Sequence, residues 1–254
     1  MKACRKYVIG VLLVLLGFVG GIPGGFLGAK DVSAQDNRRL LRTWMQGQRS
    51  AVEKIGSLRV VESVEQVMDS GFGKQELRFE AVRELGPDAQ SPGRTISRIR
   101  FNGREVPVDR GERVRRRFRS MLRPEMARLL DAYRFPVREI ARMVPSRSIT
   151  QEALDGTPMW RVDSVPRNQG GPIERLTAWF DQYDFRLQAS QTVLSLPRGN
   201  SLRIRTAYDR FDGIDLPVHR QVEGSTPVRR RMRLFTMLFE QRVEYSDYEI
   251  TRKD

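Results

Sequence analysis

The feature that most constrains this chain is that the spacing of its apolar residues changes twice. From Leu58 to Phe101 apolar and polar side chains alternate, across residues 111–144 the apolar ones recur every three or four positions, and from Met159 onwards alternation returns. A period of two is typical of a strand with one buried face, and a period near 3.6 is typical of an amphipathic helix. Two groups of hairpin-connected strands with helices inserted between them predict an α+β fold rather than a parallel βαβ sheet.

The first group contains a helix and three strands. Residues 38–55 have helical spacing, with Asp36 or Asn37 as a candidate N-cap. Three antiparallel strands follow, and the third ends at Asn102-Gly103, a dipeptide typical of tight hairpin turns.

The central insert is predicted to be helical. Val114, Phe118 and Leu122 lie on one stripe, Pro124 either kinks this helix or begins a second one, and Pro136 opens a shorter apolar segment. The apolar stripe needs a partner, and each strand offers one apolar face. A single strongly curved antiparallel sheet wrapped around the inserted helices satisfies both, and this is the fold we expect.

The last part of the chain is β again, with about six strands. Asp212-Gly213 is a second hairpin signal, and the final strands are expected at Met232–Phe239 and Val243–Ile250. We find no internal repeat, so residues 35–254 are expected to form one domain.

The N-terminus has the pattern of a secretory signal peptide. Basic residues precede a short apolar run from Tyr7 to Val19, and Val32-Ser33-Ala34 places small residues before a cleavage site after Ala34. An uncleaved inner-membrane anchor is the alternative, because the apolar run can be extended to Ala29. Residues 1–34 are therefore the predicted signal peptide, and the periplasm is the predicted location.

Charge and cysteine content narrow the classes of function. Residues 1–34 hold four basic side chains and one acidic one, so the net charge of +14 for the whole chain becomes +11 for the remainder. This charge favours an anionic lipid surface or reflects a preference for arginine codons, and a secreted chain makes nucleic acid an unexpected partner. Cys4 is the only cysteine and precedes the apolar run, so disulfides, thiolate metal sites and a cysteine nucleophile are excluded from the mature chain.

With this order of elements, the chain resembles the periplasmic outer-membrane lipoprotein-sorting proteins, the LolA/LolB-like fold, over residues 40–254. The resemblance also involves five short segments: Arg100–Val106, Asp155–Val162, Thr177–Asp181, Asp212–Pro217 and Val243–Ile250. It implies an open half-barrel with helices as a lid over an apolar cavity that accepts acyl chains. On this basis the candidate cavity residues are Phe79, Phe101, Phe118, Leu122, Trp160, Phe180, Ile204 and Tyr208.

The resemblance thus implies a carrier of lipid or lipoprotein acyl chains towards the outer membrane, with no cofactor or metal. The alternative is a non-enzymatic module on the same scaffold that binds an envelope protein or senses the state of the envelope. A filled core and a cavity have the same alternation pattern, so the sequence leaves both functions open. Most of the candidate residues would be apolar in any folded β domain.

Other polar groups were considered as sites. His219 is the only histidine and no G-x-S-x-G motif is present, so an enzyme is not expected. Asp181 and Asp184 are interpreted as turn formers. Five arginines lie on the polar side of the first inserted helix, as in a membrane-surface or partner-binding helix or as in a solvated outer face: Arg113, Arg115, Arg116, Arg117 and Arg119.

Overall fold

The computed structural model describes residues 34–70, 73–86, 93–122, 124–131, 133–145, 149–167, 172–196, 200–230 and 233–253, which belong to one compact unit. All of the predicted signal peptide except Ala34 lies outside the described residues. The helices are α1 (Ala34–Glu53), α2 (Val108–Met121), α3 (Pro124–Asp131) and α4 (Pro136–Ile140). The strands are β1 (Ile55–Asp69), β2 (Lys74–Leu85), β3 (Gly93–Phe101), β4 (Arg104–Val106), β5 (Met143–Pro145), β6 (Thr150–Leu154), β7 (Thr157–Pro166), β8 (Ile173–Asp181), β9 (Leu187–Leu196), β10 (Asn200–Phe211), β11 (Ile214–Arg230) and β12 (Arg233–Arg252).

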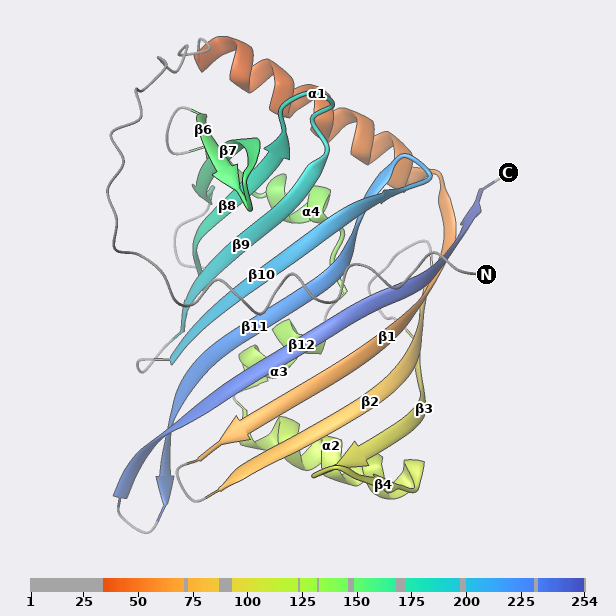
Figure 1. Cartoon of the computed structure of the whole chain (residues 1–254), viewed down its shortest axis with the longest axis vertical. Helices are drawn as coiled ribbons and strands as arrows, with labels where there is room; N and C mark the ends of the chain where they lie inside the picture. Colours follow the sequence, from red (N-terminus) through yellow and green to blue (C-terminus); the bar gives the residue numbers. More distant parts are fainter. Residues whose placement is uncertain are drawn as a thin grey trace. The chain divides into compact units, whose positions relative to one another are not determined.

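The strands form one antiparallel sheet in the order β4-β3-β2-β1-β12-β11-β10-β9-β8-β7-β5, with β6 also paired to β7 (Figure 1). The last strand in the chain, β12, pairs with the first, β1, so the two β groups become one continuous sheet. The ends of this order, β4 and β5, each pair on one side, so the sheet is open.

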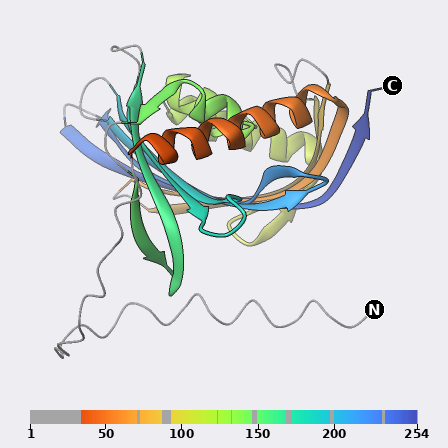
Figure 2. The same ribbon diagram turned by 90° about the horizontal axis from the view of Figure 1, so that it is seen from above.

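The sheet is strongly curved, and the helices lie on its concave side (Figure 2). Irregularities in the ladders, such as those between Glu80 and Ala81 and between Trp179 and Phe180, contribute to the bending, since a bulge increases local twist. The predicted arrangement, a single curved open sheet around inserted helices, is therefore confirmed.

Three of the hairpins turn on a dipeptide that ends in glycine. Asn102-Gly103, Asp155-Gly156 and Asp212-Gly213 have φ angles of 46° and 78°, 50° and 81°, and 51° and 80°. Positive φ at both central residues is the type I′ turn, whose twist matches that of antiparallel strands. The turns predicted at Asn102-Gly103 and Asp212-Gly213 are confirmed.

The core lies between the concave face and the helices. Burial alternates along β1, where Val60, Glu62 and Val64 point inwards and Val61 and Ser63 are more exposed. From the other side the insert contributes Phe118, Met126 and Leu130 to the same apolar cluster. The apolar stripe of the inserted helices thus packs against the apolar faces of the strands.

Helix α2 packs especially closely on β3. Gly111 is buried, and a Cβ atom at that position would lie 2.7 Å from Cγ2 of Ile99. Phe101 of β3 and Phe118 of α2 meet edge to face with ring centroids 6.1 Å apart. The helix is therefore seated on the sheet by its glycine and its phenylalanine.

The structure differs from the prediction at several element boundaries. Ile55, expected in the first helix, is the buried first residue of β1, and Asp36 and Asn37 lie within α1 instead of before it. Pro124 begins α3, so the second of the two alternatives for this proline holds. The two predicted final strands are one strand, β12, because Gln241 keeps the inward phase that Phe239 and Val243 share.

Candidate functional site

A buried cluster of charged side chains around Glu62 of β1 holds elements of the concave interior together. The Glu62 carboxylate accepts hydrogen bonds from Arg83 Nε at 2.7 Å and from Arg94 Nε at 3.1 Å. Arg83 also donates to the Asp131 carbonyl oxygen at 2.9 Å, and Arg119 Nη2 lies 2.8 Å from the Asp131 carboxylate. The cluster thus connects the end of α3 to β1, β2 and β3.

The charges of this cluster favour the ionised form of Glu62. Burial raises the pKa of Glu62, but Arg94 and Arg83, by their charge and their hydrogen bonds, lower it further, so the net pKa lies below its ordinary value. A fully buried carboxylate that stays charged is stable only while both guanidinium groups remain in place.

A second buried carboxylate, Asp215 of β11, holds α1 against the sheet. Its Oδ2 accepts hydrogen bonds from Trp44 Nε1 at 2.7 Å and from the Leu187 backbone N–H at 3.1 Å. Arg210 Nε donates to Oδ1 at 2.8 Å, and Gln48 Oε1 accepts the backbone N–H of Asp215 at 2.9 Å. Helix α1 and strands β9 and β10 therefore converge on one side chain of β11.

Between these two anchors, a small hollow lies on the seam where α3 and α4 meet β10, β11 and β12. Its volume is about 30 Å³. Its lining mixes apolar, aromatic and charged groups: Leu129, Arg134, Glu139, Ile204, Thr206, Tyr208, Pro217, Arg220 and Tyr245. A space of this size holds a water molecule or two, whereas ligand pockets measure about 300–1,000 Å³.

The polar groups of the seam are satisfied largely by one another. Arg220 Nη2 donates to the Leu130 carbonyl oxygen at 2.8 Å, and its guanidinium lies 5.9 Å from the ring centre of Tyr245. Arg134 Nη1 lies 3.0 Å from Glu139 Oε1, and the Tyr208 and Ser190 hydroxyls are 2.8 Å apart. Arg220 thus fixes the last turn of α3 as Arg83 does.

The structure divides the predicted cavity residues among three places. Phe79, Phe101, Phe118 and Leu122 gather where β2 and β3 meet α2, and Ile204 and Tyr208 line the seam. Phe180 lies below α1 with its ring 5.1 Å from that of Trp44, and Trp160 is its cross-strand neighbour. Five of the eight are buried, and Phe101, Trp160 and Ile204 are partly buried against the same core. They belong to one continuous apolar layer, but only two line the hollow.

The predicted basic residues of α2 do not all behave alike. Arg113, Arg116 and Arg117 are exposed. Arg115 is mostly covered and its Nη2 lies 3.1 Å from Glu112 Oε2, while Arg119 reaches Asp131 as described above. The polar side of α2 is a solvated outer face over a packed core, and part of it belongs to the charge cluster of the interior.

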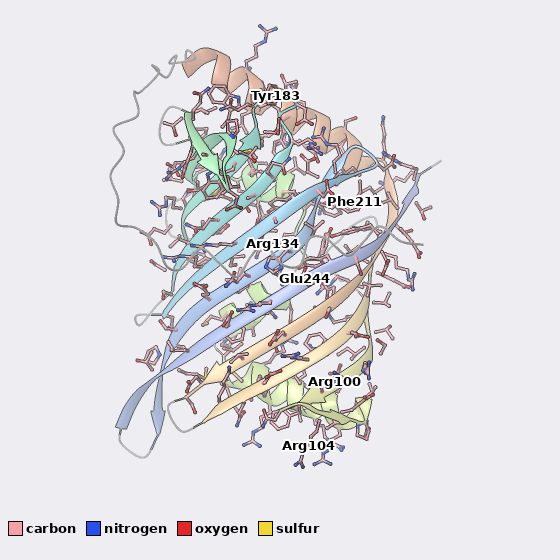
Figure 3. All side chains as sticks on the ribbon, in the orientation of Figure 1. Arg100, Arg104, Arg134, Tyr183, Phe211 and Glu244 are labelled. Atoms are coloured by element: carbon pink, nitrogen blue, oxygen red, sulfur yellow. The ribbon has the colours of Figure 1, made fainter. Side chains whose placement is uncertain are left out.

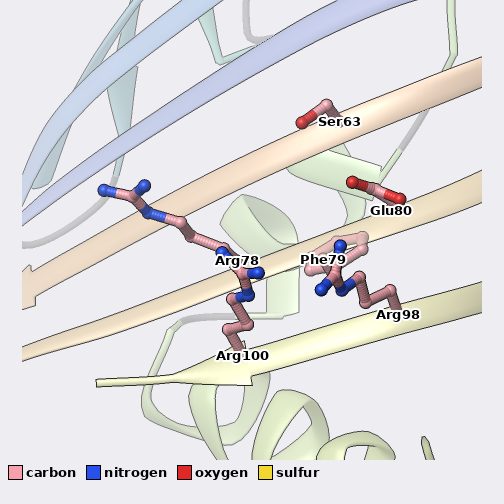
Figure 4. A pocket seen from close by; sticks show the side chains of 6 residues that line it. All are labelled: Ser63, Arg78, Phe79, Glu80, Arg98 and Arg100. Atoms are coloured by element: carbon pink, nitrogen blue, oxygen red, sulfur yellow. The ribbon is translucent and has the colours of Figure 1, made fainter. Parts of the chain in front are cut away.

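A wider hollow of about 190 Å³ opens on the outer face of β1, β2 and β3 (Figure 4). It is lined by Ser63, Arg78, Phe79, Glu80, Arg98 and Arg100. Arg78 Nη2 lies 3.1 Å from Glu65, and Arg98 Nη2 lies 3.0 Å from Glu105. Because these carboxylates and Glu80 offset its arginines, this hollow is less suited to an anion than its lining suggests.

The remaining predicted polar groups have structural surroundings. His219 Nδ1 lies 2.6 Å from Glu244 Oε1 on the surface of the sheet. Asp181 Oδ1 accepts the backbone N–H of Tyr183 at 2.8 Å and that of Asp184 at 3.3 Å, which confirms Asp181 as a turn former. Within the described ranges, no three His, Cys, Asp or Glu side chains form a group that could hold a metal ion.

Sequence reasoning missed the two residues that organise the interior, Glu62 and Asp215. A signal for Glu62 was present, because it shares the inward phase of Val60, Val64 and Met68. An acidic residue in an apolar phase predicts a buried carboxylate with a basic partner. Asp215 follows the Asp212-Gly213 turn, and its interior position depends on α1 crossing that turn.

Comparison with known proteins gives likenesses in structure only. Neither a protein-family model nor a curated protein matches the chain by sequence. An outer membrane lipoprotein-sorting protein domain from Vibrio parahaemolyticus is 8% identical, with a TM-score of 0.41 over 86% of this chain and 94% of that one. A DUF1329 family protein from Desulfovibrio piger is 11% identical, with a TM-score of 0.40 over 82% and 92% of the two chains. A LolA superfamily protein from Nitrosomonas europaea is 9% identical, with a TM-score of 0.37 over 84% and 94%.

Two of these structures carry the name of the family that the sequence resembles. Across the part of the chain that the structure describes, no helix has the length and apolar character needed to span a membrane.

Proposed function

We propose that this protein is a non-enzymatic periplasmic carrier that shields the acyl chains of a lipid or lipoprotein between the concave face of its sheet and helices α2–α4. The observation that supports this most is the seam of α3 and α4 with β10–β12, where apolar side chains of the insert, such as Met126 and Leu130, pack against the sheet beside a hollow of about 30 Å³. Its partners would be acyl chains and, in keeping with its net charge, an anionic membrane surface.

In this proposal the acyl chain replaces the apolar side chains of α3. Met126 and Leu130 are fully or almost fully buried, and withdrawing them from the core costs about 1.5–3 kcal/mol each. Each buried methylene contributes about 0.8 kcal/mol, so a chain of about fifteen methylenes gains about 12 kcal/mol. Relative to an acyl chain in water, the exchange therefore favours the loaded state if the helix can leave.

The hydrogen bonds that hold α3 to the sheet are compatible with release of this helix. Arg83 and Arg220 hold α3 by the carbonyl oxygens of Asp131 and Leu130. Carbonyl groups at a helix end have no partner within the helix, and water can satisfy them once they are exposed. After release Arg83 keeps its ion pair with Glu62, so this buried pair of charges stays intact.

The proposal is tested on the mature protein by mass spectrometry of extracted lipid and by uptake of a fluorescent fatty acid. Ile204→Trp, which enlarges a side chain at the seam, is expected to lower uptake. Arg203→Trp, the neighbouring exposed residue on the opposite face of β10, is the matched control and should leave uptake unchanged. No bound lipid and no uptake by the wild type would refute the proposal.

The small volume of the hollow described at the seam, about 30 Å³, favours a second candidate, a module that binds an envelope protein or senses the state of the envelope. This candidate predicts a stable protein complex and no lipid in the purified protein. A pull-down from an envelope extract that recovers only lipoproteins would count against it.

A further inference from the structure

Positive charge is concentrated in one short stretch of this chain. Residues 98–121 hold nine arginines and three acidic residues, a net charge of +6 in 24 residues. Residues 1–34 account for +3 of the +14 of the whole chain, so the remaining 196 residues carry only +5. A general preference for arginine codons would spread the positive charge evenly along the chain, whereas the observed charge is concentrated in residues 98–121.

The fold brings this stretch together at one end of the sheet. The β3–β4 hairpin and α2 are neighbours at the edge, and Arg100 and Arg104 are labelled there (Figures 1 and 3). Along α2, Arg110, Arg113 and Arg117 follow one another at spacings of three and four residues, which places them on one side of the helix. These three arginines are exposed, whereas Gly111 and Phe118 are buried against the core.

We define the basic end as Arg104, Arg110, Arg113, Arg116 and Arg117, all of which are exposed. Within the described parts of the chain, no carboxylate forms an ion pair with any of these residues except Asp109, which lies 3.6 Å from Arg113. Asp109 is itself exposed, so this contact is screened by water. The basic end therefore presents guanidinium groups whose charge is largely uncompensated.

We infer that the basic end is a docking surface for an anionic lipid bilayer. Guanidinium groups bind phosphate oxygens in a bidentate manner, and several on one helix face suit a plane of headgroups better than one small anion. One exposed apolar side chain, Met121, lies one turn beyond Arg117 on the same side of α2 and can enter the interfacial region. Because α2 is seated on β3, the charges are presented by a fixed element.

This inference adds to the proposed carrier function a surface by which the carrier binds a membrane. It rests on the proposed function only for the biological purpose of that binding. Vesicle binding needs no open interior. The two ideas can therefore fail separately, since acyl uptake and vesicle binding are independent measurements.

The test is co-sedimentation of the mature protein with vesicles of phosphatidylcholine alone or mixed equally with phosphatidylglycerol. The wild type is expected to sediment only with the anionic vesicles and to be released by salt. A triple variant of α2 should weaken this binding at least about ten-fold and keep acyl uptake. It combines Arg113→Gln, Arg116→Gln and Arg117→Gln. A triple variant with the same loss of charge, Arg175→Gln, Arg203→Gln and Arg205→Gln, uses exposed strand arginines from β8 and β10 and should bind nearly as the wild type does.

Equal losses in the two triple variants would overturn the inference, because binding would then follow net charge and not this surface. Failure of the wild type to bind anionic vesicles would overturn it as well. If the wild type ignored vesicles but bound immobilised poly-glutamate through the three α2 arginines, the partner would be an acidic protein instead of a bilayer.

Discussion

Replacing Glu62 by glutamine should destabilise the protein far more than its small change in shape suggests. The side chain is 0% exposed and is shared by Arg83, which is 2% exposed, and Arg94. In Glu62→Gln both guanidinium groups stay buried without their carboxylate, and breaking a buried pair in this way costs about 3–5 kcal/mol. For a chain of this size the expected decrease in melting temperature is roughly 6–20 °C.

The matched control is Glu65→Gln on the same strand. Glu65 pairs with Arg78 at 3.1 Å on the outer face, where both side chains are at least one-third exposed. Such pairs contribute about 0–1 kcal/mol, so this variant should melt close to the wild type. Thermal and urea unfolding of both variants measure the difference, and a Glu62→Gln variant as stable as Glu65→Gln would refute the reasoning.

The effect should also depend on pH. The pKa of Glu62 in the folded state is lowered below its unfolded value. Its contribution is therefore present above the unfolded pKa and is lost as the pH falls through the folded pKa. The stability gap between the wild type and Glu62→Gln should be full at neutral pH and should narrow below about pH 4. A gap that widens on acidification would contradict the assigned direction.

Two further pairs of variants test the seating of the helices by thermal melting. Trp44→Phe removes the indole hydrogen bond to the buried carboxylate of β11 and should cost about 1.5–3 kcal/mol, whereas Trp179→Phe, whose indole N–H has an exposed partner at 3.4 Å, should cost about 0.5 kcal/mol or less. Gly111→Ala should destabilise by about 1–3 kcal/mol despite the better helix propensity of alanine, because the new methyl overlaps Ile99. Gly47→Ala, with no atom near its Cβ position, should stabilise α1 by up to about 1 kcal/mol. Equal results within either pair would contradict the packing described.

The order and type of the elements could be predicted because each follows from spacing within a short stretch of sequence. The alternation along β1 and β2, the helical stripe through Phe118 and the Asp-Gly and Asn-Gly turns are local signals. The boundaries that failed are also local. Ile55 fits a helical stripe as well as a strand phase, and the polar run Glu240–Arg242 resembles a turn although Gln241 faces inwards.

The content of the interior could not be predicted in the same way. Whether Ile204 lines a hollow and Phe180 lies under α1 depends on which helix covers which part of the sheet, and alternation does not record this. The division of the α2 arginines between solvent and the charge cluster of the interior also depends on how the helices are placed. Arg119 turns to Asp131 and Arg116 faces solvent because of where α3 lies, and their sequence neighbourhoods are alike.

The central claim, that an acyl chain enters between the insert and the concave face, is tested most directly by photo-crosslinking. A fatty acid that carries a diazirine on its chain is bound to the mature protein, irradiated, and located by peptide mapping. Labels on α3 and on inward-facing residues of β10–β12, such as Leu129, Ile204 and Tyr208, are the predicted result. Labels confined to the outer face of the sheet, or no labelling above that of a detergent-competed sample, would contradict it.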